Sequence, residues 1–263
     1  MKKIYAVFIS GLSVLAFSSC EGFLDKFPET SLSPETFYTS EKELELATNG
    51  FYTMLPSPDN TTDGALQDND LEYHISLSSL QMGNRSAENE SWSSSTWSNL
   101  RALNYYLEHS VNCTSEDIRK KYDGVAYFFR AMFYYEKVRK YGDIPWYDHV
   151  ISANDKASLY RARDSRGFVM QKIMEDLDKA IDGLPVTWTE GVYRINKYAA
   201  YAFKSRVALF EGTWRKYHDV PDETYTKDDG TQLTLSSEYF LRQSADAAKA
   251  VIDYGKYKMY TGE

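Results

Sequence analysis

Apolar side chains recur every three or four residues along much of the chain, the spacing that is typical of amphipathic helices. The pattern predicts helices over about 40–55, 97–111, 114–141, 165–184, 196–210 and 236–254. The helix over 114–141 has apolar residues on more than one face, so we expect it at the centre of the fold. No segment is rich in strand signals, and the fold class is therefore predicted to be all-α.

Capping residues support these boundaries. Ser40 is followed three residues later by Glu43, which predicts a capping box. Further N-caps are predicted at Thr114, at Asp164 or Ser165, at Asn196 and at Ser236 or Ser237. Small residues occur where helices would approach closely, which favours a tetratricopeptide-like stack of helical pairs. Two irregular loops, 143–162 and 214–235, are expected to interrupt the stack.

The first twenty residues have the pattern of a secretory signal. Two lysines precede an apolar run over 4–17, which is too short to span a membrane comfortably, and Ser18 and Ser19 follow directly before Cys20. This pattern is typical of bacterial lipoproteins, so we expect a signal peptide over 1–19, an acylated Cys20 and a tether over 20–39. An ordinary buried thiol is the alternative for Cys20.

The segment 56–96 has weak apolar periodicity and many turn residues. A polar loop of this length in a compact chain is usually either functional or disordered. It contains aromatic, amide and charged side chains, the mixture that holds the apolar face and the hydroxyl rim of a sugar. The candidate glycan-binding residues are Trp92, Arg85, Asn84, Asn89 and Asp70.

Each strong candidate has a structural alternative. Trp92 is equally well explained as a plug that packs on Trp97, and Arg85 as a partner in a surface ion pair. Trp97 itself is expected in the core. Arg130 lies among apolar residues, so we expect it to be buried and paired rather than in contact with a ligand.

Composition and motifs exclude several classes of protein. The formal net charge is -8, which argues against nucleic acid as a partner. The two cysteines and four histidines form no metal-ligand motif, and no nucleophile elbow, P-loop or dinucleotide fingerprint is present. Carboxylate pairs occur, but 38 acidic residues produce such pairs by chance. The sequence therefore predicts a protein that is not an enzyme and has no metal or other cofactor.

Several segments, taken in order, resemble the SusD/RagB family of nutrient-binding outer-membrane lipoproteins. The matching stretches are EGFLDKFPETSLSPETFYTSEKELELATNGFYTML, the helix around Trp97 and Asn104, VAYFFRAMFYYEKVRKYGDIPWYDHVI, RDSRGFVMQKIMEDLDKAIDGLP, residues 196–210 and SADAAKAVIDYGKYKMY. Six matches in the same order cover essentially the whole chain. Family members continue well past the last of them, so residues 40–263 are interpreted as a SusD-like N-terminal helical domain that is truncated at its C-terminal end.

The resemblance implies a non-catalytic lipoprotein on the cell surface, anchored in the outer membrane by the lipid on Cys20. Such a protein binds a starch-type or other oligosaccharide nutrient and delivers it to a TonB-dependent, SusC-like transporter. Two alternatives remain open. In the first alternative, the chain binds no glycan and is a structural scaffold for the transporter. In the second, it is a peptide-binding, RagB-like member of the family.

Overall fold

The structure is a computed structural model that describes residues 37–55, 81–84, 86, 92, 94–189, 191, 193–227 and 229–259. The chain divides into two compact units, Met1–Phe37 and Tyr38–Glu263. Almost all of the first unit lies outside the described residues, including the expected signal peptide and Cys20. The fold is therefore that of the second unit.

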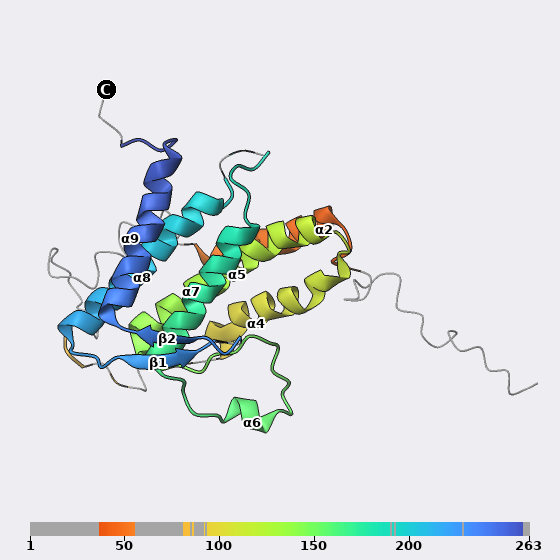
Figure 1. Cartoon of the computed structure of the whole chain (residues 1–263). Helices are drawn as coiled ribbons and strands as arrows, with labels where there is room; N and C mark the ends of the chain where they lie inside the picture. The colour runs from red at the N-terminus through yellow and green to blue at the C-terminus, as the bar shows by residue number, and fades with distance from the viewer. Residues whose placement is uncertain are drawn as a thin grey trace, which may run out of the picture. The chain divides into compact units, whose positions relative to one another are not determined.

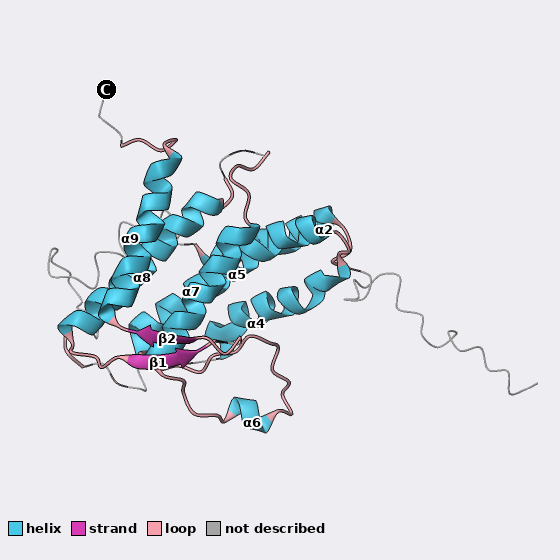
Figure 2. Cartoon of the chain, in the orientation of Figure 1, coloured by secondary structure: helices cyan, strands magenta, loops and turns pink. Residues whose placement is uncertain are grey.

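The described part of the second unit is mostly helical, as expected for an all-α, tetratricopeptide-like protein (Figure 2). Its α-helices are α2 (Glu41–Asn49), α4 (Ser94–His109), α5 (Glu116–Tyr141), α6 (Lys156–Leu159), α7 (Arg166–Gly183), α8 (Lys197–Tyr217) and α9 (Ser237–Tyr254). Two 3₁₀ helices, η2 (Gly50–Met54) and η3 (Ser110–Asn112), follow α2 and α4. The strands β1 (Glu223–Thr226) and β2 (Gln232–Leu235) form one small sheet.

Helix α5 is central, as predicted. It packs against α2, α4 and α7, while α8 packs against α7 and most extensively against α9 (Figure 1). The buried residues of α5 lie on several of its faces and include Val125, Phe129, Tyr134 and Val138. Removing such apolar surface from water is the main source of the free energy that stabilises this arrangement.

The predicted helix starts are confirmed at four positions. Ser40 and Glu43 form the capping box, and the side chains of Ser165, Asn196 and Ser236 each accept a hydrogen bond from a backbone N–H three residues on. The prediction for α5 is wrong by one residue, because its N-cap is Ser115 and not Thr114, and no side chain caps it.

The predicted helix over 97–111 is wrong at both ends. Helix α4 starts at Ser94, inside the segment that was expected to be irregular, and it ends at His109. The 3₁₀ helix η3 follows, with about three residues per turn in place of the 3.6 of an α-helix, and it changes the direction of the side chains that come next. Val111 was expected on the apolar stripe and is instead 61% exposed.

A β-hairpin replaces part of the loop that was predicted over 214–235. Helix α8 continues to Tyr217, and β1 and β2 then pair in antiparallel register with Tyr225 opposite Leu233. Tyr225 and Leu235 are buried against the helices. Alternating Thr and Leu residues beside Asp229-Gly230 are a hairpin signal that the helical periodicity concealed.

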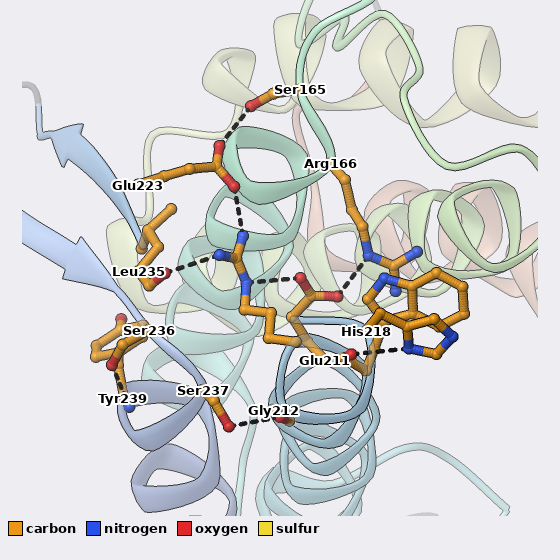
Figure 3. Close-up of polar contacts among 12 residues, drawn as sticks. Ser165, Arg166, Glu211, Gly212, His218, Glu223, Leu235, Ser236, Ser237 and Tyr239 are labelled. Atoms are coloured by element: carbon orange, nitrogen blue, oxygen red, sulfur yellow. Dashed lines mark hydrogen bonds and ion pairs between the residues drawn. The ribbon is translucent and has the colours of Figure 1, made fainter. Parts of the chain in front are cut away.

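A buried ionic network attaches this hairpin to the helices. Arg215 on α8 donates to Leu235 O at 2.8 Å and forms ion pairs with Glu211 at 2.9 Å and Glu223 at 2.7 Å. The other oxygen of Glu211 accepts from Arg166 Nε at 2.8 Å, so one carboxylate serves two arginines (Figure 3). The network therefore joins the start of α7, helix α8 and both strands.

Candidate functional site

A groove of about 560 Å³ lies between α4 and the segment that connects α5 to α7; we call it the Trp92 groove. It is lined by Trp92, Trp97, Ser98, Leu100, Arg101, Asn104, Pro145, Tyr147, His149, Val150, Ile151, Leu159, Arg161 and Arg163. One wall is therefore regular helix and the other is irregular backbone. Its size falls in the range of small-ligand sites in proteins.

Trp92 packs on Trp97, as its structural alternative predicted, and it also lines the groove. Its ring lies edge-to-face against Trp97, with centroids 5.0 Å apart, and against Tyr141 at 4.8 Å. Trp97 in turn packs on Phe133 and is half-buried, so the prediction of a core residue holds only in part. Trp92 nevertheless remains 41% exposed, which leaves aromatic surface available at the groove.

The irregular wall is fixed by hydrogen bonds from side chains to backbone. The Asn104 amide on α4 donates to the carbonyl oxygens of Tyr147 and His149, both at 3.0 Å. Arg101 donates to Ile151 O at 2.9 Å. The Tyr134 hydroxyl accepts from Tyr147 N at 2.6 Å. These bonds hold the loop against two helices although it has no secondary structure of its own there.

Asn104 is itself positioned by a buried ion pair. Arg130 is 4% exposed and forms a bidentate pair with Asp176, with N–O distances of 2.7 and 2.8 Å. Burial opposes the charge of Arg130, but Asp176 outweighs it and raises the pKa of the guanidinium above its ordinary value. Arg130 Nη1 then donates to Asn104 Oδ1 at 3.1 Å. This confirms the prediction that Arg130 is structural, and it places the pair directly beneath the groove.

Of the predicted glycan-binding residues, only Trp92 is placed at the groove. Asn84 is exposed and does not line it. Arg85, Asn89 and Asp70 lie outside the described residues.

The groove contains residues that the sequence did not single out. Tyr147, His149 and Arg161 come from the predicted loop 143–162, and Arg163 follows it directly. A signal was present there, because residues 146–163 combine a Trp-Tyr pair with His149, Arg161 and Arg163 in a short polar stretch. The candidate ligand residues were instead predicted in the longer loop over 56–96.

A second cavity, of about 550 Å³, lies beside the N-terminal end of α8 and the C-terminal end of α9. Two of its three aromatic lining residues, Tyr198 and Trp188, are occupied by packing, while Tyr257 is 54% exposed. Tyr198 stacks on Tyr254 with centroids 3.7 Å apart, and Trp188 is only 7% exposed. Its one charged lining residue, Arg194, binds Glu45 and Asn49. This cavity offers a sugar fewer free groups than the Trp92 groove.

Two further observations concern the described residues alone. No three His, Cys, Asp or Glu side chains in that part of the chain are grouped so that they would hold a metal ion. None of its helices combines the length and the apolar character needed to cross a membrane.

The chain is similar to several proteins of Formosa agariphila. It is 25% identical over 238 residues to SusD-like protein P25 and 26% identical over 235 residues to SusD-like protein P2. These alignments cover 81% and 82% of the chain but only 44% and 45% of the two relatives. The chain therefore spans less than half the length of the relatives that it matches.

Solved structures show the same fold. A SusD-like protein from Bacteroides fragilis superposes with a TM-score of 0.67 at 23% identity, over 90% of this chain and 42% of that one. A SusD-like carbohydrate-binding protein from the same species gives a TM-score of 0.62 at 17% identity, over 85% and 42% of the two chains.

The family comparison covers most of the chain. Residues 22–209 match the SusD-like family that is described as starch-binding and associating with the outer membrane. This range includes α2, α4, α5 and α7, the Trp92 groove and most of α8. The order of the matching segments and the shared fold agree with it, and the chain therefore belongs to the SusD-like family.

Proposed function

We propose that this protein binds an oligosaccharide in the Trp92 groove and does no chemistry on it. The observation that carries the proposal is the exposed part of Trp92 beside arginine side chains in a groove of ligand size. An aromatic ring covers the apolar C–H face of a sugar, and guanidinium groups bind its oxygens. Membership of a starch-binding family supports the same ligand class and a non-catalytic role.

The proposal extends to location and partner. A lipid on Cys20 holds the protein at the outer-membrane surface, where it delivers the oligosaccharide to a TonB-dependent, SusC-like transporter. The family description supports association with the outer membrane. The basic, apolar and small-residue pattern before Cys20 supports the anchor.

Isothermal titration of the purified protein against a panel of oligosaccharides tests the binding function. Trp92→Ala is expected to weaken binding by about 1–3 kcal/mol, since an aromatic anchor is lost. Tyr217→Ala is the control, because Tyr217 is 74% exposed and does not line the groove. Unchanged affinity in a stable Trp92→Ala variant would exclude the groove as the site. No heat with any oligosaccharide, while the transporter still co-purifies, would favour the scaffold function.

Fractionation of cells tests the anchor. Cys20→Ala is expected to move the protein from the membrane fraction to the soluble fraction, because the acylated thiol is removed. A variant that still sediments with membranes in high salt contradicts lipid anchoring at Cys20.

A further inference from the structure

The side chains with an ionisable nitrogen or carboxyl group that line the Trp92 groove in the described part of the chain are all arginine or histidine. They are Arg101, His149, Arg161 and Arg163, and no Asp or Glu is among the lining residues. The composition of the chain does not explain this, because it has 38 acidic and only 30 basic side chains. The groove is thus a cationic site on an acidic protein.

Neighbouring carboxylates compensate two of these groups. Asp164 forms an ion pair with Arg161 and also accepts from Trp146 N at 2.7 Å. The Oδ1 atom of Asp148 lies 3.0 Å from the Nδ1 atom of His149. Glu108 also lies nearby, but its carboxylate accepts from the backbone N–H of Val150. The charge on the loop is therefore partly balanced from within the loop itself.

Arg101 and Arg163 are not compensated in this way. Both are exposed, and within the part of the chain that the structure describes neither forms an ion pair. Arg101 donates one N–H group to Ile151 O, and the other N–H groups of its guanidinium remain available to a ligand. Arg163 lies over the Trp92 ring, with its guanidinium carbon 5.3 Å from the ring centroid. Arg163 therefore borders the aromatic surface of Trp92, and Arg101 lines the same groove.

The Asn104 amide and the arginines of the groove are poorly suited to a neutral sugar. Sugar hydroxyls donate hydrogen bonds as well as accept them, so a neutral ligand needs acceptors. The Asn104 oxygen already accepts from Arg130, and its NH₂ group donates to two backbone carbonyls. Guanidinium groups supply donors only. The arginines of the groove therefore match a ligand that is rich in acceptors and negatively charged.

We propose that the oligosaccharide bound in the Trp92 groove is acidic, with a carboxylate or sulfate group that Arg163 and Arg101 bind while a sugar ring contacts Trp92. This inference rests on the proposed function and specifies its ligand class. Guanidinium groups bind carboxylates and sulfates through paired, charge-assisted hydrogen bonds. The net negative charge of the protein does not prevent this, since charges more than about 8 Å apart are largely screened at physiological salt.

Calorimetry with matched pairs of ligands tests the inference. One pair is tetragalacturonate and its carboxyl-reduced, neutral form, and the other is a sulfated galactan tetrasaccharide and its desulfated form. We expect the acidic member of at least one pair to bind about tenfold or more tightly than its neutral partner. We also expect its affinity to fall when NaCl is raised from 50 to 500 mM, because salt screens the charge. The pair that responds distinguishes carboxylate from sulfate.

Variants assign the effect to the groove. Arg163→Gln is expected to lower affinity for the acidic ligand about tenfold and to lower affinity for a neutral ligand much less. Arg242→Gln is the control, because Arg242 is an exposed arginine on α9 that pairs with Glu238 and does not line the groove. Equal affinity for both members of each pair, or an equal effect of Arg163→Gln on both, overturns the inference.

The same experiment separates failure of this inference from failure of the proposed function. Binding of neutral oligosaccharides alone that is lost in Trp92→Ala would overturn the acidic ligand class and keep the glycan-binding function. No binding of any oligosaccharide, neutral or acidic, would overturn both.

Discussion

Arg130 and Arg215 are almost equally buried, at 4% and 2% exposure, and each is held by carboxylates, yet the two arginines support different parts of the molecule. The pair of Arg130 with Asp176 lies beneath the Trp92 groove and extends to Asn104. The network of Arg215 extends to the hairpin carbonyl of Leu235.

The comparison teaches that one kind of interaction attaches irregular segments to this helical scaffold at two places. In each case a buried guanidinium pairs with a carboxylate on a helix and also donates to a backbone carbonyl of a neighbouring loop or strand. Only one of the two networks touches groove residues. Stability and ligand binding should therefore respond separately when the two networks are changed.

The largest effect is expected from Glu211→Ala. This carboxylate is fully buried and binds Arg166 and Arg215 at once. Its loss leaves Arg166 without its carboxylate partner and Arg215 with Glu223 alone, so we expect the free energy of unfolding to fall by about 4–5 kcal/mol. Urea denaturation measures the change. Glu238→Ala, which breaks an exposed ion pair on α9, should change stability by less than about 1 kcal/mol.

Glu211→Ala also tests the separation of the two networks. Affinity for oligosaccharide, measured on the folded fraction, is expected to stay unchanged, because Glu211 does not line the groove. A large loss of affinity in this variant would show that the two networks act as one unit.

Arg130→Ala is expected to cost slightly less stability but to affect both properties. Asp176 would be left buried without its cation, and we expect a loss of about 3–4 kcal/mol in unfolding free energy. Asn104 would lose the donor that fixes its side-chain oxygen, so the groove loop should loosen and oligosaccharide affinity should fall. Retention of full affinity in the folded variant would show that the ion pair stabilises the fold only.

Asp123 shows what a buried carboxylate costs without such a partner. It lies on α5, its Oδ1 atom has no hydrogen-bond partner, and none of the described residues forms an ion pair with it. Burial raises the pKa of Asp123 to about 6. The folded protein therefore binds this proton more tightly than the unfolded chain, in which the pKa is near 3.8.

The pH dependence follows from that difference. The contribution of Asp123 to stability is greatest below pH 4 and is lost as the pH rises through 6. Asp123→Asn should therefore stabilise the protein by about 1–3 kcal/mol at pH 8 and have little effect near pH 4. Thermal unfolding of both proteins across this range measures it. A constant difference at all pH values would assign the effect to packing instead of charge.

The two walls of the groove differ in how far the sequence predicts them. The helical wall was predictable, because the apolar spacing and caps of the helices are local in sequence. The burial of Arg130 was also predictable, since an arginine among apolar residues of a central helix needs a partner. The prediction of Trp92 as a ligand contact stays a prediction, although the residue lies at the groove.

The irregular wall was not predictable from local patterns. Its geometry depends on bonds such as Asn104 to His149 and Arg101 to Ile151, which join residues 45 and 50 positions apart. Such bonds recognise backbone carbonyls, which every residue has, so they leave no mark on the composition of the loop. The ligand residues were consequently predicted in 56–96 and not in 143–162.

Asn104→Ala examines the connection between the ion pair and the loop directly, and its expected effect on stability is smaller than that of Glu211→Ala or Arg130→Ala. It removes two donors to loop carbonyls and one acceptor for Arg130, and we expect a loss of about 1–2 kcal/mol in unfolding free energy. Oligosaccharide affinity should fall more than this modest loss of stability suggests, because the bonds that align the groove wall are gone. Calorimetry and urea denaturation on the same preparation measure both.

The matched control is Ser244→Ala. Ser244 is 7% exposed and donates to Ser205 O at 2.9 Å, so it is a buried polar residue with a backbone partner between α8 and α9. Its loss should cost about 1 kcal/mol of stability and leave affinity unchanged. If both variants reduce affinity equally, the groove responds to general stability. If only Asn104→Ala does so, the buried Arg130 pair acts on ligand binding through this one amide.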